Sequence, residues 1–411
     1  VLDQNTGYFE DDFEGTKYAW QYIRDSLSTV AQTTQLPSWK LGTPASSRTS
    51  INSPPVTGVT NNNVWATGLT TTKVADERSI LYSPSLDMTG FIRPMISFDA
   101  NWDLNKDGVV LEYSSDKKNV ADPTKQWQTI GDNKTGVNWF NDQLIASRPG
   151  DNPSGYGWTG TSEKNTWVES KHELSNAIGV PPSQRSNIVF RFAFASKNAQ
   201  GDGFAFDNLR IGERTRTILL EDFVTTNSGD VAKNSLIKSE KEAITTFTNS
   251  VGIGTNVVNL NYHIGFTGSD PFNLDNPADP SARALYYNVK DVPWAFLDGA
   301  RPSDADADPK FSIWGQRAYN NQTLVLGQSD ITVPSPTVNP DGSIKFDVQV
   351  KALYNLPDNT ILHVAIIEQS VLFSGLAQPQ KDMVKTNEST FDYVVKKMLP
   401  NGFVTSVGKF I

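Results

Sequence analysis

The first half of the chain alternates apolar and polar residues over short runs. Residues 109–114 and 188–194 place a large apolar side chain at about every second position, as a strand with one buried face does. Clusters of Asn, Gly and Ser separate these runs, and helical spacing of apolar residues is nearly absent. The pattern predicts a β-sandwich over residues 1–213.

The spacing changes in the middle of the chain. An apolar strand at residues 217–223 precedes residues 231–251, in which apolar positions recur with helical spacing among Lys and Glu. A second strand follows at residues 257–262. Strand, helix and strand in this order form a βαβ unit, for which parallel pairing is the default. The sequence therefore predicts an α/β domain over residues 214–334.

A Pro-rich junction around Pro336 begins a third region. Residues 344–350 alternate strictly, and residues 361–368 form another strand after a Pro-Asp-Asn turn. These runs predict a small immunoglobulin-like β domain over residues 335–411, which we expect to be truncated at its C-terminal end.

Charge and composition narrow the classes of function. The 411 residues carry a net charge of -9, and no stripe of Lys and Arg offers a surface for phosphates, so a nucleic-acid partner is not expected. No apolar run reaches the ~20 residues that cross a bilayer, so we expect no membrane-spanning segment. Without cysteine the chain has no thiolate chemistry, disulfide or cysteine metal site.

Catalysis is not indicated by the remaining residue types either. The three histidines, His172, His263 and His363, fall in three different predicted domains, so none is paired by sequence with a nucleophile. No two carboxylates are singled out as an acid and base pair. We expect no catalytic residue, and a protein that is not an enzyme.

Four segments of the first domain carry a resemblance to a known family. Residues 12–15, 81–87, 107–114 and 203–209 have the sequences DFEG, LYSPSLD, DGVVLEYS and GFAFDNL. In this order they resemble the MAM and cleaved-adhesin jelly rolls, over about half of the chain. The resemblance implies adhesion and ligand binding without catalysis, often with structural calcium.

A candidate calcium loop leads into the third of these segments. Asp103, Asn105 and Asp107 supply oxygen atoms at alternate positions before a glycine, which is how a calcium loop begins. The closing glutamate is missing, because Ser114 stands at its position. The same residue types also suit a plain turn between two strands, so both interpretations stay open. From the resemblance, Glu14 and Asp207 are the first further ligands to consider.

Tryptophans divide into two groups by their surroundings. Trp139 and Trp158 lie in Gly- and Asn-rich loops and are candidate ligand contacts, because a flat ring can cover the apolar face of a sugar. Trp102 and Trp127 neighbour strand positions and are expected in the core.

Residues 219–231 and 286–299 of the second domain have the sequences LLEDFVTTNSGDV and YYNVKDVPWAFLDG, and these segments resemble a thioredoxin-like domain of outer-membrane-associated surface proteins of Bacteroidota. That family places a Cys-x-x-Cys motif after the first strand, where this chain has Ser228 and Val231, and a cis-proline at the position of Pro293. Disulfide exchange requires sulfur at both positions. The resemblance therefore implies a thioredoxin-like domain with degenerate redox positions.

Together these features predict a multidomain, mainly β protein: a jelly-roll β-sandwich, an α/β thioredoxin-like domain, then an immunoglobulin-like β-sandwich. We expect a non-catalytic adhesion or structural assembly protein, extracellular on a Gram-negative cell surface, and a substrate of type IX secretion. Its expected partners are a surface protein or glycan ligand, with outer-membrane or secretion-system components. The alternative is a glycan- or peptide-binding accessory module of a surface enzyme or uptake system. Ser26, in Asp25-Ser26-Leu27, matches a short O-glycosylation signal of this bacterial group.

Overall fold

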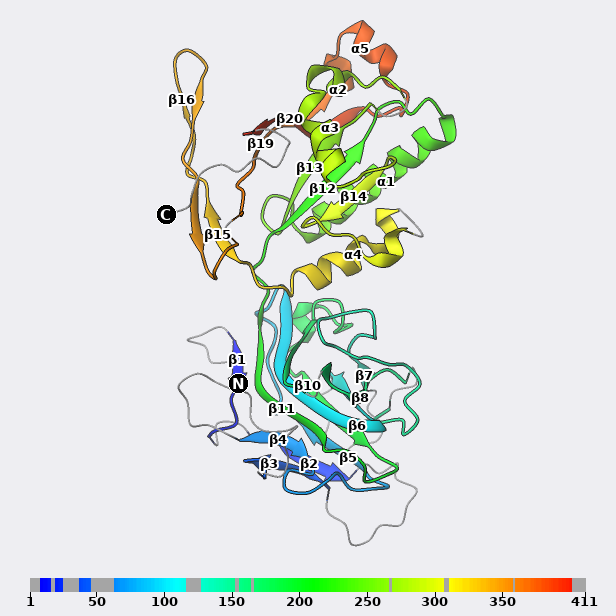
Figure 1. Cartoon of the computed structure of the whole chain (residues 1–411), viewed down its shortest axis with the longest axis vertical. Helices are drawn as coiled ribbons and strands as arrows, with labels where there is room; N and C mark the ends of the chain where they lie inside the picture. The colour runs from blue at the N-terminus through cyan, green and yellow to red at the C-terminus, as the bar shows by residue number, and fades with distance from the viewer. Residues whose placement is uncertain are drawn as a thin grey trace. The chain divides into compact units, whose positions relative to one another are not determined.

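The computed structural model forms two compact units, Val1–Arg214 and Thr215–Ile411 (Figure 1). Their boundary lies within one residue of the expected one. Ser26 lies outside the described residues. The structure describes residues 8–15, 19–24, 37–45, 63–115, 127–151, 155–163, 166–265, 268–306, 310–357 and 359–400.

The regular elements of the first unit are almost all β-strands, as its alternating pattern predicts. Hydrogen bonds connect eleven strands of its described part into one sheet. Its elements are β1 (Phe9–Asp11), β2 (Gln21–Arg24), β3 (Trp39–Gly42), β4 (Val64–Thr67), β5 (Arg78–Tyr82), β6 (Pro94–Ser114), β7 (Gln128–Thr129), β8 (Trp158–Thr161), β9 (Val168–Glu173), the short 3-10 helix η2 (Pro182–Gln184), β10 (Val189–Ala195) and β11 (Gly203–Glu213).

The long strand β6 pairs with different strands along its length, so that it connects the two halves of the sandwich, the strands beside its beginning and those beside its end. Its first half pairs with β11 and β9, its second half pairs with β10 and β7, and its middle, from Asp103 to Val109, pairs with β8. Between the halves Asn105 has a left-handed φ of 57°, and the pairing of β6 with β8 shifts register there. The strands predicted at residues 109–114 and 188–194 are the second half of β6 and strand β10, so both predictions are confirmed.

Aromatic rings fill the interior of the first unit. Phe192 stacks on Phe206 with ring centroids 4.2 Å apart, and Phe98 meets Phe192 edge-on at 5.3 Å. Trp39 packs against the same cluster and is fully buried. Each such ring removes about 150–250 Å² of surface from water, so this aromatic cluster dominates the stability of the sandwich.

The second unit combines helices with a five-stranded sheet. Helices α1 and α4 contribute to the core on one face of the sheet, and α3 contributes to the core on the other (Figure 1). Its elements are β12 (Ile218–Val224), α1 (Val231–Val251), β13 (Val257–His263), α2 (Pro271–Asp275), α3 (Ala278–Tyr286), β14 (Trp294–Leu297), η3 (Ser303–Asp306), α4 (Phe311–Gln322), β15 (Ser329–Thr332), β16 (Thr337–Val338), β17 (Ile344–Lys345), β18 (Gln349–Ala352), β19 (Val364–Leu372), η4 (Phe373–Gly375), α5 (Gln378–Met383) and β20 (Thr390–Leu399).

The predicted βαβ unit is confirmed. β12 and β13 pair in parallel, and α1 connects them over the residues predicted to be helical. The carboxylate of Asp230 caps the start of α1 by accepting a hydrogen bond from the backbone N–H of Lys233. At its other end Gly252 has a φ of 99°, which only glycine adopts without strain.

The prediction of a separate immunoglobulin-like domain over residues 335–411 is wrong. β20 pairs in parallel with β13 at Asn261 and Val394, and β19 pairs antiparallel with β20, giving the strand order β14-β12-β13-β20-β19. The last two strands therefore extend the sheet of the α/β unit. The segments before them form two separate ladders, β15 with β18 and β16 with β17. Local alternation marks a strand but does not specify which sheet it joins.

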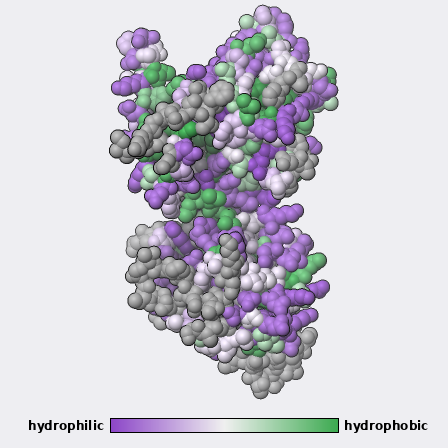
Figure 2. Space-filling model, in the orientation of Figure 1, coloured by the Kyte–Doolittle hydropathy of each residue, from purple (hydrophilic) through white to green (hydrophobic). Residues whose placement is uncertain are grey.

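The surface of the protein is largely hydrophilic. Figure 2 shows hydrophilic residues over much of the visible face of each unit. In the part of the chain that the structure describes, no helix combines the length and the apolar character needed to cross a membrane.

Candidate functional site

A lysine neutralises the segment predicted to open a calcium loop. Lys73 is fully buried, and its ammonium pairs with Oδ2 of Asp107. The same ammonium donates to the backbone oxygen of Asn198 at 2.6 Å and to its Oδ1 at 3.3 Å. The second oxygen of Asp107 accepts from the backbone N–H of Lys197 at 2.8 Å. Lys73 thus occupies the position in which a bound cation would meet these oxygens.

The other predicted ligands of this loop have partners of their own. Thr161 Oγ1 donates to Asp103 Oδ1 at 3.3 Å, and Asn105 Nδ2 donates to Gln200 at 2.6 Å. Calcium needs six to eight oxygens that converge on one point. The residues at 103–107 do not fit this requirement. They do not form a plain turn between two strands either, because β6 continues through them.

Glu14 and Asp207 lie together in what we name the acidic cluster, made of Asp12, Glu14, Asp99 and Asp207. Pairing of β1 with β11 brings the DFEG and GFAFDNL segments side by side. The rings of Phe13 and Phe206, one from each segment, meet edge-on at 5.4 Å. Two segments almost two hundred positions apart in the sequence thus build one site.

Electrostatic repulsion characterises the acidic cluster. Burial, opposed by a hydrogen bond from the backbone of Asn208 and assisted by the negative charges of Asp99, Glu14 and Asp12, raises the pKa of Asp207 to about 7. Burial also raises the pKa of Asp99. Amide groups compensate in part, because Asn208 donates to Asp207 Oδ1 at 2.7 Å and to Asp99 Oδ2 at 2.9 Å. The cluster therefore favours a proton or a cation.

Glu14 is held by neighbouring amides rather than by a cation. The backbone N–H and the side-chain amide of Asn63 donate to its two oxygens at 2.8 Å and 2.9 Å. Among the described residues, no group of three or more His, Asp or Glu side chains is arranged to hold a metal ion. Calcium at the predicted ligands Glu14 and Asp207 stays a prediction.

The prediction that Trp139 and Trp158 form a ligand-contact surface is wrong. They are 4% and 0% exposed, and their ring centroids lie 5.1 Å apart. Trp158 also meets Phe140 edge-on at 4.7 Å. Turns in the Gly- and Asn-rich loop direct these rings into the core of the sandwich. Trp102 and Trp127 are buried, as predicted.

The degenerate redox positions lie at the start of α1. Ser228 is buried, and its hydroxyl donates to the backbone oxygen of Asp230 at 3.1 Å and to Oδ1 of Asn234 at 2.9 Å. Val231 is the first residue of the helix and is 84% exposed. The peptide bond before the buried Pro293 is cis, as the resemblance implies. Because both partners of the Ser228 hydroxyl belong to the turn and to the first turn of α1, this serine stabilises the turn before the helix.

A buried histidine and aspartate pair lies near the same turn. His263 Nδ1 and Asp270 Oδ2 are 2.9 Å apart, and Asp270 also accepts from the backbone N–H groups of Thr226 and Phe272. The imidazole packs on the ring of Phe272. Asp270 caps α2, so this pair joins β12, β13 and α2. The Asp-Pro sequence that begins α2 was the signal for this cap.

Sequence reasoning missed a second buried polar network. Arg283 donates to both oxygens of Glu221, at 2.8 Å and 3.1 Å, and Tyr287 donates to Glu221 Oε2 at 2.5 Å. Tyr262 completes the network at 3.1 Å. These residues come from β12, β13, α3 and the position directly after α3, so no local pattern connects them.

Among known proteins, the chain is similar only to solved structures. No protein-family model and no curated protein match the chain. The K1 cleaved adhesin domain of Lys-gingipain from Porphyromonas gingivalis W83 shares 15% identity, covering 50% of this chain and 98% of that one, with a TM-score of 0.26. The family 30 carbohydrate-binding module of a cellulosomal cellulase from Clostridium thermocellum shares 12%, covering 51% and 99%, with a TM-score of 0.28. These values are too low to transfer a role.

Proposed function

We propose that this chain is a non-catalytic adhesion or assembly protein of the outer surface of a Gram-negative bacterium. The observation that carries the proposal is the acidic cluster. The DFEG and GFAFDNL segments, which carry the resemblance to adhesin-type jelly rolls, meet there across β1 and β11. A sandwich with a fully packed aromatic core is a rigid support for loops that contact a partner.

In this proposal the acidic cluster binds a structural Ca²⁺. Carboxylate oxygens are the ligands that calcium prefers, and Glu14 and Asp207 are the carboxylates that the resemblance points to. The position of Asp207 beside Glu14 and Asp99, and its raised pKa, support this, because a cation placed there would offset the desolvation of the carboxylate and the repulsion from its neighbours. Calcium would then stiffen the junction of β1, β6 and β11.

The second unit would act as a thioredoxin-like scaffold without redox chemistry. Its parallel β12 and β13 joined by α1 support this assignment, and the chain has no cysteine. Export by type IX secretion, a surface protein or glycan as ligand, and outer-membrane or secretion-system partners belong to the same proposal. The accessory-module alternative loses its two contact residues, because Trp139 and Trp158 are buried.

Two experiments test this proposal. Antibody labelling of intact cells of the source bacterium is expected to detect the protein without permeabilisation, and labelling only after permeabilisation would contradict surface exposure. Purified full-length chain is expected to adhere to whole cells or to immobilised surface proteins and glycans, with no turnover of those glycans or proteins. Reproducible turnover that survives repeated purification would replace the proposal with an enzyme.

A further inference from the structure

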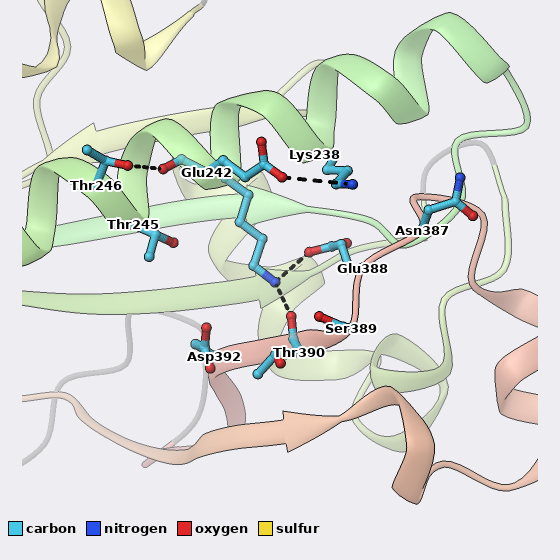
Figure 3. Close-up of a pocket in the computed structure, with 10 residues that line it drawn as sticks. Lys238, Glu242, Thr245, Thr246, Asn387, Glu388, Ser389, Thr390 and Asp392 are labelled. Atoms are coloured by element: carbon cyan, nitrogen blue, oxygen red, sulfur yellow. Dashed lines mark hydrogen bonds and ion pairs between the residues drawn. The ribbon is translucent and has the colours of Figure 1, made fainter.

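A polar groove lies between helix α1 and the beginning of strand β20 (Figure 3). Its volume is about 380 Å³, within the range of about 300–1,000 Å³ typical of small-molecule sites. Lys238, Lys241 and Thr245 belong to one wall, at positions that share a face of α1. The opposite wall comes from residues 387–390 and Asp392. The two walls are more than 130 positions apart in the sequence.

One buried ion pair joins the two walls. The Lys241 ammonium pairs with the Glu388 carboxylate and donates to the backbone oxygen of Thr390 at 3.0 Å. The side chains of Lys241 and Glu388 are only 13% and 8% exposed. Thr386 donates its hydroxyl to the other oxygen of Glu388. This pair therefore sets the width of the groove and leaves the rim residues to meet a ligand.

The lining excludes most ligand classes by its chemistry. All ten lining side chains are polar, so an apolar or aromatic ligand finds no surface to pack on. Three carboxylates outnumber two ammonium groups, which disfavours phosphate and other anions. No metal-holding trio exists among the described residues. A neutral ligand with many hydroxyl groups is the class that remains compatible with this polar lining.

The rim presents both hydrogen-bond donors and acceptors. Glu242 and Asp392 offer carboxylate oxygens, each able to accept two hydroxyl groups of a polyol. Lys238 and Asn387 offer N–H donors to ring and hydroxyl oxygens, and the Lys238 ammonium is only loosely paired with Glu242, at 3.9 Å. Thr245 adds a hydroxyl that both donates and accepts.

We propose that this groove binds a neutral polyhydroxylated ligand, a free sugar or a sugar unit of a glycan. The site lies in the second unit and does not depend on the acidic cluster, so either can fail without the other. Lys241 and Glu388 position the walls, and Glu242, Asp392 and Thr245 contact the ligand.

Saturation-transfer NMR on the full-length chain tests this site. The probes are glucose, mannose, galactose and N-acetylglucosamine, each as the free sugar and as its methyl glycoside, with inorganic phosphate as the anionic contrast. We expect saturable transfer to at least one sugar. Asp392→Asn and Thr245→Val should each weaken binding about tenfold, the effect of losing one good hydrogen bond. Ser235→Ala, on α1 outside the groove, is the matched control and should bind like the wild type.

Each outcome decides the matter. Transfer to methyl glycosides as well as free sugars would support a glycan ligand, and transfer to free sugars alone would support a small soluble one. No transfer to any probe sugar would overturn the proposal. Equal binding by wild type, Asp392→Asn and Thr245→Val, or binding of phosphate in place of sugars, would overturn it as well.

Discussion

Replacement of Lys73 by methionine tests whether a buried ammonium holds its own loop, strand β6 and the loop of Asn198 together. The substitution keeps the length of the side chain and removes its charge. Lys73 and Asp107 have side chains that are 0% and 2% exposed, so Asp107 would stay buried with only the backbone N–H of Lys197 as a partner. The backbone oxygen of Asn198 would lose its donor too.

The size of the effect follows from these contacts. Removing one member of a buried ion pair costs about 3–5 kcal/mol, because the remaining charge is desolvated without compensation. An exposed lysine has no such partner, and its loss changes stability by about 0.5 kcal/mol at most. Lys106→Met, on the same bend of β6, is therefore the control.

Unfolding in urea, followed by tryptophan fluorescence, measures the difference. Eight of the ten tryptophans lie in the first unit, so the signal reports the sandwich. We expect a loss of about 3–5 kcal/mol for Lys73→Met and almost none for Lys106→Met. A loss below about 1 kcal/mol for Lys73→Met would refute the argument, because it would show that water solvates Asp107 in the native state.

Three further predictions concern buried charges. In chelator at pH 8, Asp207→Asn should raise the thermal midpoint. The pKa of Asp207 is about 7 in the folded protein and near 4 in the unfolded chain. The stability of the wild type therefore falls as the pH rises between these two values, by about 4 kcal/mol at most, and the variant escapes this loss. With Ca²⁺ the same variant should lose any calcium-dependent rise, and a full rise in the variant would exclude Asp207 as a ligand. Burial also raises the pKa of Asp222 to about 7. Asp222→Asn should therefore stabilise the second unit more at pH 8 than at pH 5, as measured by thermal unfolding followed by circular dichroism. Equal stabilisation at the two pH values would contradict the raised pKa. Arg283→Met should lower the free energy of unfolding of the second unit, measured in urea, by about 3 kcal/mol. Arg283→Lys should restore only part of this stability, because lysine cannot make both contacts with Glu221. Full restoration by lysine would argue against the paired geometry.

Elements fixed by local pattern could be predicted from the sequence. The helix at residues 231–251 and the strands on either side of it follow from the spacing of apolar residues, and the structure confirms their parallel pairing. The alternation at residues 188–194 predicts β10, whose phenylalanines face the core. In each case the residues that decide the structure lie within one element.

Features fixed by distant partners could not be predicted. Asp107 looked like a calcium ligand because nothing nearby marks Lys73, 34 positions earlier, as its partner. Trp158 looked exposed because its loop is rich in Gly and Asn, yet the loop folds back onto the aromatic core. The strand β20 looked like part of a new domain, although its parallel partner β13 lies more than a hundred positions before it. The polar groove beside α1 depends on the same distant pairing.

The passage of β6 through both halves of the sandwich has a mechanical consequence. Traction applied along this strand would load its hydrogen bonds to β11 and β9 and those to β10 and β8 together, in shear rather than one after another. A strand clamped over 21 residues cannot slide out without rupturing the aromatic interior as well. A tether built on such a strand would hold under pulling forces and then yield abruptly, as one cooperative unit.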